Sequence, residues 1–448
     1  MNEKENVKAI LLKKMTMLLK RLIEKNNTAF RIYADVYHMM VSLKNKICRN
    51  RNSENKQSNV EQIETLRKMV SIAEKENRKI YGKAIIDKYD DNKKTALLVS
   101  HEFSFTGAPI ALLSFAEVLL KKGLQVVMIS PDDRGLGRIA EERGIPAVVY
   151  EDLYRSDIVL EIVKLFDLVV ANTAASAPVI CRIDGTDSPV IWWIHEAKTF
   201  YICSSARKMP RSVKGNIHIY CVGKYAQRML ESRFSRYKTK QLIYCANDIS
   251  LVDSGDVSDF KKCVVNKTVF ACVGTIEYRK GQDILLKAIE LLDEEIRDDC
   301  EFVFVGVASN NNIKNSIVEM EKEYPKQIKY YEGLPPKELY EIYRMMDYII
   351  CASRDDPMPL VIAEAMTLCK PCICSCNTGS ADIINKYDSG YVYEDDDPAK
   401  LAGLITKACT IKGEEYRRIS GNARKGFEEE YSEKVFEKNV TEIIDNIM

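Results

Sequence analysis

The chain has 448 residues, more than one hydrophobic core usually organises, so two or three folded units are expected. It is 46% hydrophobic and 29% charged, which is ordinary for a globular protein and indicates neither a membrane nor a disordered class. No run reaches the roughly 18 apolar residues of a spanning helix, and Lys13, Lys14, Lys20 and Arg21 interrupt any signal peptide. Since its 14 cysteines are scattered, the sequence predicts a cytoplasmic protein with reduced thiols.

Residues 1–90 are predicted to form a basic helical extension. Residues 1–60 hold 13 Lys and Arg against 5 Asp and Glu, whereas the rest of the chain holds 53 against 60. Residues 7–23 have the spacing of an amphipathic helix, with most lysines opposite its apolar face. A basic segment favours an anionic partner. We therefore expect residues 7–24 either to contact the inner face of a membrane peripherally or to pack as a helix or coiled coil.

Beyond residue 90, short apolar runs alternate with helical stretches. Strands are predicted at 95–100, 125–130, 147–150, 168–171, 190–194, 217–222 and 241–244, and then at 268–273, 301–305, 328–331, 348–351, 371–376 and 390–393. Such alternation produces right-handed βαβ units and a parallel sheet. The predicted fold is α/β, with two Rossmann-like doubly wound domains at 91–250 and 251–430 and a hinge within 246–266. Because ligands bind beyond the carboxyl ends of such strands, we expect the site in the cleft between the domains.

Two acids in the second domain give the strongest chemical signal. Asp356 lies in a proline-containing loop directly after an apolar strand, and Glu364 lies eight residues later on the following helix. The loop brings backbone N–H groups and a helix N-terminus together, which is a natural phosphate cradle. Two carboxylates would repel a diphosphate unless they bind hydroxyls, as a sugar nucleotide would allow. The alternative makes Asp356 a helix-terminal acid and Glu364 a solvated residue.

A second signal lies in residues 274–282, between a strand and a helix. Arg279 and Lys280 stand where a strand ends at the expected cleft, so they could neutralise the charge of a leaving diphosphate. The alternative is an ordinary surface Arg-Lys-Gly sequence.

With these motifs, the chain resembles the bacterial group 1, or family 4, retaining glycosyltransferases, which have the two-Rossmann GT-B architecture. The resemblance covers about residues 95–430. It rests on the spacing of Asp356 and Glu364, with Asp where Glu is usual, and on Gly274, Lys280 and Gly281. Thr275 replaces a common arginine, and Arg279 could supply that charge. In this architecture the final helix, 431–448, crosses back to the first domain.

The resemblance also implies roles for individual residues. Arg279 and Lys280 would bind the donor diphosphate beside Gly274, Glu364 would bind the ribose, and Asp356 would contact the donor sugar. The backbone of Leu360 and Val361 would lie near the phosphates, and Gly333 and Leu334 would flank the base.

The first domain is expected to hold the acceptor. Gly107, between the first strand and its helix, resembles the family's glycine loop, although Thr106 replaces a frequent first glycine. His195 follows an apolar strand at the cleft, where the family often has a histidine that contacts the donor sugar or orients the reacting groups. The alternatives are a plain turn at Gly107 and a structural role for His195.

The predicted activity is transfer of a sugar from a UDP- or GDP-sugar to a hydroxyl of a saccharide or lipid-linked acceptor, with retention of configuration. Neither a metal nor another cofactor is expected, because no set of His and Cys has ligand spacing and Arg279 and Lys280 could replace a cation. Nucleic acid is not an expected partner. The alternatives are a sugar-nucleotide epimerase or phosphorylase of the same architecture, and a non-catalytic partner-binding protein.

Overall fold

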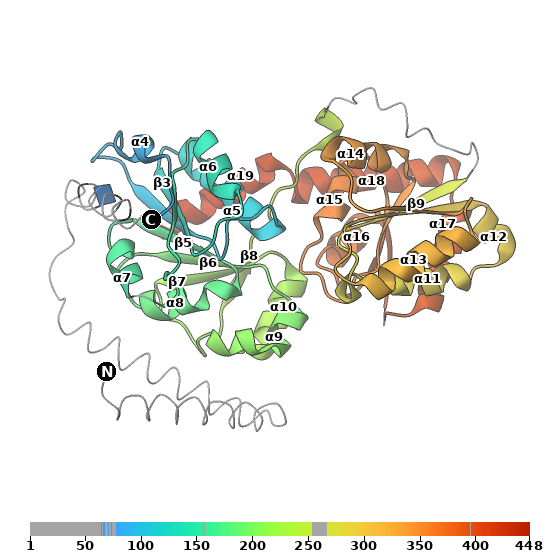
Figure 1. Ribbon diagram of the computed structural model, residues 1–448, viewed down its shortest axis with the longest axis horizontal. Coiled ribbons are helices and arrows are strands. Elements are labelled where there is room, and N and C mark those ends of the chain that lie inside the picture. Colours follow the sequence, from blue (N-terminus) through green and yellow to red (C-terminus); the bar gives the residue numbers. More distant parts are fainter. Residues whose placement is uncertain are drawn as a thin grey trace, which may run out of the picture.

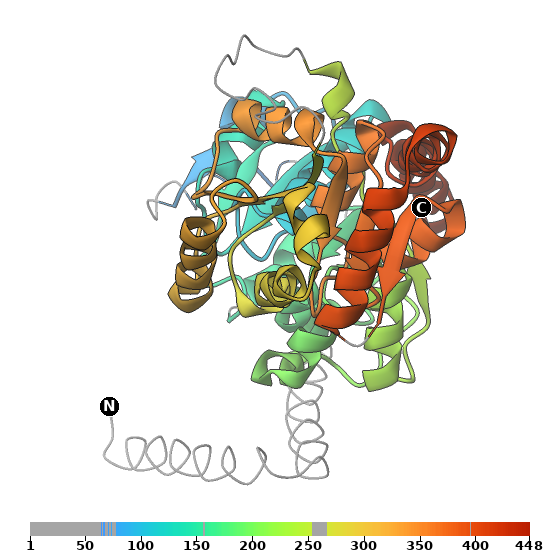
Figure 2. The ribbon, with the colours of Figure 1, turned by 90° about the vertical axis from the view of Figure 1, so that its right-hand side faces the viewer.

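The computed structural model describes residues 78–155, 157–252, 267–394 and 396–448, together with residues 64, 66, 67, 70 and 73. The amphipathic helix predicted at 7–24 and most of the predicted hinge lie outside the described residues. The described chain forms two α/β domains side by side, each built on a largely parallel sheet (Figure 1). Figure 2 looks along the long axis from the second domain, so that the two domains lie one behind the other. The predicted pair of Rossmann-like domains is thus confirmed.

The first domain contains a sheet with the order β1-β4-β3-β2-β5-β6-β7-β8. Its strands are β1 (Ile80–Tyr81), β2 (Thr95–Val99), β3 (Gln125–Ser130), β4 (Ala147–Val149), β5 (Leu168–Asn172), β6 (Val190–Ile194), β7 (Ile217–Cys221) and β8 (Thr239–Gln241). Strand β1 pairs antiparallel with β4, and the other pairs are parallel. Strands β2, β3, β5 and β6 are buried along their whole length, as expected for a parallel sheet covered on both faces.

Helices connect these strands and cover the sheet. They are α4 (Lys83–Ile86), α5 (Gly107–Lys121), α6 (Leu136–Glu142), α7 (Ile158–Val163), α8 (Ala177–Ile183), α9 (Lys198–Ile202) and α10 (Lys224–Arg233), with short 3-10 turns η1 (Ala174–Ser176), η2 (Ser204–Lys208) and η3 (Ile249–Leu251).

The second domain contains a parallel sheet with the order β11-β10-β9-β12-β13-β14. Its strands are β9 (Thr268–Val273), β10 (Cys300–Val305), β11 (Ile328–Tyr331), β12 (Tyr348–Cys351), β13 (Cys372–Ser375) and β14 (Gly390–Tyr393). Its helices are η4 (Tyr278–Lys280), α11 (Gln282–Glu290), α12 (Glu294–Asp298), α13 (Asn311–Glu323), α14 (Pro336–Met345), α15 (Leu360–Thr367), α16 (Ala381–Tyr387), α17 (Pro398–Thr410) and α18 (Gly413–Glu430).

Both sheets have one topological switch point, where the strand order reverses. In the first domain it lies between β2 and β5, and in the second between β9 and β12. The loops after these strands leave the same edge of each sheet in divergent directions, and the crevice between them is where doubly wound sheets bind ligands. The loops that carry Gly274 and Asp356 follow β9 and β12, so they lie at such a point.

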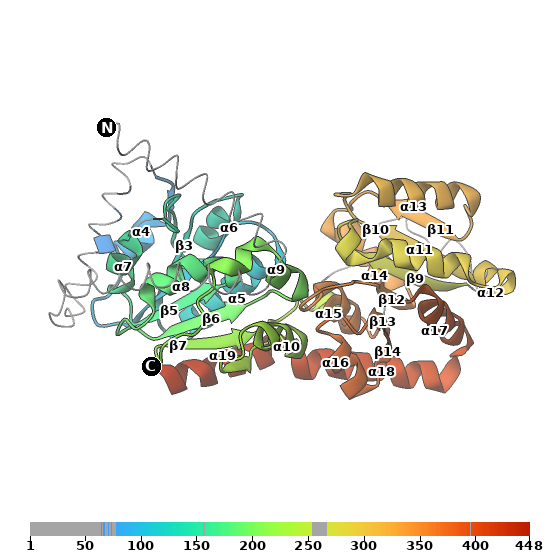
Figure 3. The same ribbon diagram turned by 90° about the horizontal axis from the view of Figure 1, so that it is seen from below.

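The last helix, α19 (Glu433–Ile447), packs beneath the first domain. Helix α18 packs on α15 and α16 of the second domain, while α19 contacts α5 of the first domain. Figure 3 shows the two helices following one another along the lower side of both domains. Phe436 on α19 is 2% exposed and lies against Phe115 and Trp193 of the first domain, with ring centroids 6.3 and 5.8 Å away. The chain therefore crosses from the second domain back to the first.

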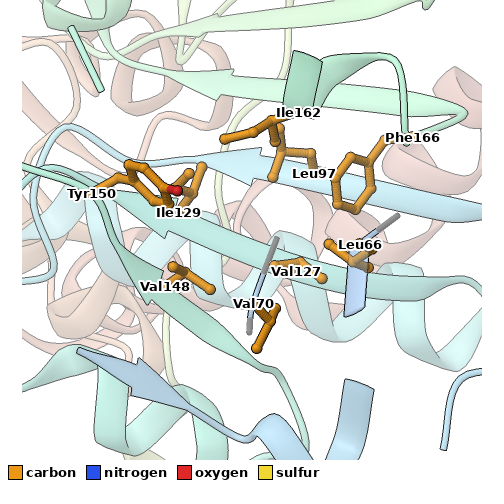
Figure 4. Close-up of a pocket in the computed structure, with 9 residues that line it drawn as sticks. All are labelled: Leu66, Val70, Leu97, Val127, Ile129, Val148, Tyr150, Ile162 and Phe166. Atoms are coloured by element: carbon orange, nitrogen blue, oxygen red, sulfur yellow. The ribbon is translucent and has the colours of Figure 1, made fainter. Parts of the chain in front are cut away.

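The residues described before position 78 cover one face of the first sheet. Leu66, Val70 and Ala73 are at most 5% exposed and follow the spacing of one helical face. Leu66 and Val70 line a cavity of about 30 Å³ together with strand residues such as Val127 and with Phe166 (Figure 4). This segment thus contributes to the core of the first domain.

Three details differ from the sequence prediction. Residues 80–81, within the expected helical extension, form strand β1, which pairs with the edge strand β4. The last strand of the first domain lies at Thr239–Gln241, because Gln227 and β7 hold that segment, whereas the apolar run at 241–244 had indicated a later strand. Helices α12, α13, α16 and α18 of the second domain had not been predicted individually. No helix among the described residues combines the length and apolar character needed to cross a membrane.

Candidate active site

Glycines shape the loop between β9 and α11. Gly274 has φ 141° and Gly281 has φ 70°, which are values that side chains rarely allow. A Cβ at Gly281 would lie 2.0 Å from the carbonyl oxygen of Ala352 at the end of β12. This close approach brings the loop that carries Arg279 and Lys280 directly against the strand that precedes Asp356.

Lys280 and Asp356 form a partly buried ion pair. The Lys280 Nζ donates to Asp356 Oδ2 at 2.7 Å, and Arg279 Nη1 lies 3.7 Å from the same oxygen. Burial alone would lower the pKa of Lys280, but the charge of Asp356 and this hydrogen bond outweigh it, so the pKa is raised. The structure therefore joins the two strongest sequence signals at one point.

Arg279 has further partners in the loop regions. Its Nη2 donates to Glu277 Oε1 at 2.7 Å, and its Nη1 donates to the carbonyl oxygen of Asp355 at 3.0 Å. Arg279 and Lys280 are therefore both hydrogen-bonded to acceptors within the protein, and both lie at the switch point. An incoming anion would share or replace these partners.

Glu364 lies on α15, on the other side of the same loop. Its Oε2 accepts a hydrogen bond from the hydroxyl of Tyr343 on α14 at 2.7 Å. Burial raises the pKa of Glu364, and the Tyr343 hydrogen bond partly opposes this rise. Tyr343 was not singled out from the sequence, since only the packing of α14 on α15 brings it to Glu364.

The remaining second-domain candidates surround this centre. Leu360 and Val361 begin α15 and are half-buried, whereas Gly333 and Leu334 follow β11. Gly333 has φ 80°, and a Cβ there would lie 3.0 Å from Val307. Gly333 and Leu334 thus mark the far end of the sheet edge from Asp356.

His195 follows β6 in the first domain and lies between two aromatic rings. Its ring centroid is 4.5 Å from that of Trp193 and 6.0 Å from that of Tyr244, whose ring is nearly parallel to it. Burial lowers the pKa of His195 to about 3, so the imidazole is neutral at physiological pH. Its Nε2 is buried without a hydrogen-bond partner among the residues that the structure describes. A buried side-chain nitrogen without a partner is exceptional in folded proteins, and a bound water or ligand is one explanation for it.

The carboxylate of Glu196 is bound to backbone N–H groups. Its carboxylate accepts from the backbone N–H of Ala174 at 2.8 Å and of His195 at 3.0 Å, and burial raises its pKa to about 7. It thereby holds the turn after β5, where Thr173 has φ 69°.

Tyr244 connects the histidine to the second domain. It is 6% exposed, stacks on His195, and donates its hydroxyl hydrogen to the carbonyl oxygen of Met358. The charges of Asp356 and Glu364 also raise its pKa, after the larger effect of burial. The structure thus brings His195 to the edge that holds the two acids, although its position in the sequence gave no sign of Tyr244.

Gly107 begins α5 in the first domain. A Cβ there would lie 3.7 Å from Cδ1 of Leu360, an ordinary contact across the two domains. The loop of Gly107 and the start of α15 therefore face one another.

Comparison with known proteins assigns both domains to related groups. The sequence profile described as glycosyl transferases group 1 matches residues 258–426, and that described as glycosyl-transferase family 4 matches residues 92–252. A D-inositol 3-phosphate glycosyltransferase of Corynebacterium efficiens is 27% identical over 157 residues, which are 34% of this chain and 36% of that protein. The chain spans about a quarter to a third of the length of the curated relatives it matches.

Solved structures with the same fold cover more of the chain. A glycosyltransferase from Rickettsia africae has a TM-score of 0.65 at 18% identity and covers 80% of this chain and 99% of its own. The Anabaena protein Alr3699/HepE, in complex with UDP-glucose, has a TM-score of 0.61 at 17% identity and covers 79% and 99%.

Proposed function

We propose that this chain, which is a group 1 glycosyltransferase with the GT-B architecture, transfers a sugar from a nucleoside diphosphate to a hydroxyl of a saccharide or lipid-linked acceptor. Polysaccharide or glycolipid synthesis is the process that such a transfer serves. One observation carries the proposal: Lys280, Arg279 and Asp356 meet at the switch point of the second domain.

The donor would bind to the second domain. Lys280 and Arg279 are paired cations beside a glycine turn, and they could neutralise the diphosphate as its bond to the sugar breaks. Glu364 retains one carboxylate oxygen beyond its bond to Tyr343, which suits a ribose hydroxyl. Gly333 and Leu334 would flank the base, while the start of α15 at Leu360 would face the phosphates.

The donor nucleotide would be UDP or GDP. The UDP-glucose bound in the Anabaena structure, which has the same fold, supports UDP. No divalent cation is required in this proposal, because Lys280 and Arg279 supply positive charge at the leaving group.

The acceptor would approach from the first domain and react with retention. Neutral His195, with its free Nε2, could hydrogen-bond a donor-sugar hydroxyl. The carboxylate of Asp356 is engaged by Lys280, which makes it a poor covalent nucleophile. The leaving phosphate would then accept the proton of the attacking hydroxyl. Proton NMR of the fresh product would decide this point, since an inverted anomeric centre rejects retention.

The first experiment is a thermal-shift panel of UDP, GDP, ADP and CMP with their common sugars, with and without EDTA. One nucleoside diphosphate should raise the melting temperature in both conditions. Lys280→Ala should abolish this rise, whereas Lys287→Ala, at an exposed position of α11, should retain it. No response to any nucleotide from folded protein would instead favour a non-catalytic, partner-binding role.

Peripheral membrane contact through residues 7–24 completes the proposal. A variant lacking residues 1–60 should sediment less with anionic liposomes than the full chain does. Equal sedimentation would reject membrane contact while leaving the transfer reaction untouched.

A further inference from the structure

We propose that Asp355 is a positioning residue that fixes the donor loop of the second domain against the segment of the first domain that carries His195. This inference rests on the proposed transfer reaction. Asp355 follows β12 and is 5% exposed, yet its carboxylate reaches across the domain boundary. Its Oδ1 accepts from the backbone N–H of Lys198 at 3.1 Å, and its Oδ2 accepts from that of Thr199 at 2.6 Å.

A third donor from the first domain completes the arrangement. The hydroxyl of Tyr225 on α10 donates to Asp355 Oδ1 at 2.8 Å. Burial and the charge of Asp355 raise the pKa of Tyr225, so the phenol stays protonated and remains a donor. A carboxylate offers only acceptors, and hydrogen bonds to an ionised group are short and strong. Three converging donors therefore require an acidic side chain here.

The partners of Asp355 lie next to the proposed reacting groups on both sides. Asp356 is its neighbour in the chain, and Lys198 lies three residues after His195. In Figure 3, α9 and α10 form the part of the first domain that faces the loop before α15. One short path therefore runs from Asp356 through Asp355 and the start of α9 to His195.

A second contact between the domains supports the same relative position of His195 and Asp356. Tyr244 stacks on His195 and donates to the carbonyl oxygen of Met358, two residues after Asp356. Asp356 thus lies between two residues that are hydrogen-bonded to the first domain. Asp355 binds the start of α9, and Met358 binds Tyr244, which stacks on His195. These two contacts would hold Asp356, the proposed donor-sugar acid, at a constant distance from His195.

The donor cations are connected to the same point. Arg279 Nη1 donates to the carbonyl oxygen of Asp355, and Lys280 holds Asp356. The groups proposed to bind the nucleotide, however, all belong to the second domain. Loss of the Asp355 tie should therefore misplace His195 relative to the donor sugar without removing a nucleotide contact.

The test separates turnover from nucleotide binding. Asp355→Asn keeps the shape of the side chain but sets an amide N–H₂ against one of the donors. We expect turnover of the sugar nucleotide to fall by about 10- to 100-fold, because small misplacements at a reacting centre have effects of this size. The Kd for UDP or GDP, measured by calorimetry, should stay within about twofold of the wild-type value.

Arg228→Gln is the matched control. Arg228 forms an ion pair with Asp382 across the same boundary at 3.1 Å, but the two side chains are 53% and 32% exposed. An exposed pair contributes little, so turnover should be unchanged. Unchanged turnover in Asp355→Asn, or a parallel loss of turnover and nucleotide affinity, would overturn the proposal.

Small-angle X-ray scattering of the ligand-free variants tests the Asp355 contact independently of the proposed function, because it needs no nucleotide. Asp355→Asn should have a larger radius of gyration than Arg228→Gln, and equal radii would overturn the tie. If wild-type protein binds none of the nucleotides of the thermal-shift panel, the transferase proposal fails while the scattering result still stands. If Asp355→Asn does not fold, Tyr225→Phe replaces it, since this variant removes only one of the three hydrogen bonds. It must show a smaller fall in turnover and a smaller rise in radius of gyration.

Discussion

At the scale of single residues, the proposed donor site is held in place by partners of its own acids and cations. Asp356 is 4% exposed, and its carboxylate is engaged by Lys280. A buried charge without a partner is strongly destabilising, so each member of this pair keeps the other in place before a donor arrives. Glu364 differs, since its carboxylate accepts a hydrogen bond from the neutral hydroxyl of Tyr343 rather than from a cation.

Tyr343→Phe should shift the acid limb of donor binding to higher pH. In the proposed site Glu364 would have to be ionised to accept a ribose hydroxyl, so affinity should be lost as the pH falls through its raised pKa. The Tyr343 hydrogen bond lowers that pKa, and removing it raises the pKa further. At a pH on the acid limb, affinity should weaken about tenfold, the equivalent of one hydrogen bond to a charged group.

The measurement is the Kd for the nucleotide between pH 4.5 and 8, by calorimetry. Tyr340→Phe, one turn earlier on α14, is the control for loss of a phenol hydroxyl nearby. An acid limb that stays in place, or moves to lower pH, would contradict the role of Tyr343.

At the scale of elements, the glycine turn before α11 decides where the cations lie. Gly281 combines a left-handed φ of 70° with a backbone contact that leaves no room for a Cβ. The turn and the end of β12 therefore approach as closely as the backbone allows. This contact places Arg279 and Lys280 beside the loop of Asp356.

Gly281→Ala should destabilise the second domain by at least ~2 kcal/mol, because it adds a strained φ to an overlap with backbone atoms. Nucleotide binding should be lost with it. Gly403→Ala is the control, since Gly403 is exposed on α17 and a Cβ there meets no atom within 4 Å. That change should stabilise the helix by about 0.5–1 kcal/mol. Chemical denaturation and the thermal-shift assay would measure both, and a Gly281→Ala protein as stable as wild type would refute the argument.

At the scale of the whole molecule, α18 and α19 join the two domains into one packed body. The buried residues on one face of the second sheet, such as those of α15 and α18, are continuous with the core of the first domain, while the α11, α13 and α17 face forms a separate cluster. The backbone N–H of Ala246 donates to the carbonyl oxygen of Tyr431, where α18 ends. The crossing of the chain therefore packs the two domains against one another.

Phe436→Ala should lower the free energy of unfolding of the first domain by roughly 3–5 kcal/mol, since it removes a buried aromatic ring that packs on Phe115 and Trp193. The chain has two tryptophans, Trp192 and Trp193, and both lie on β6. Tryptophan fluorescence therefore reports unfolding of this domain alone. Lys438→Ala, with a side chain 72% exposed, should leave the transition within about 0.5 kcal/mol. A Phe436→Ala transition equal to that of Lys438→Ala would show that α19 does not support the domain.

Local patterns in the sequence were sufficient for the architecture and for several proposed site residues. Alternating apolar runs and helices predicted the two parallel sheets, because strands buried on both faces are apolar throughout. Asp356 and His195 were proposed as site residues because each lies in the segment that follows such a strand, where doubly wound sheets bind ligands. The shifted β8 and the missed β1 were edge strands, whose pairing depends on neighbours more than on their own composition.

Tertiary structure alone decided which side chains meet. Asp355 bonds to residues 130 to 157 positions away in the chain, and Tyr244 reaches Met358 across 114 positions. Such contacts have no periodicity that a sequence could display, because they arise only when two separately folded sheets pack at one angle. The sequence by itself thus determined the two domains and the strand ends that face the cleft. The packing of one domain on the other determined the relative position of His195 and Asp356, because these residues lie in different domains and are far apart in the sequence.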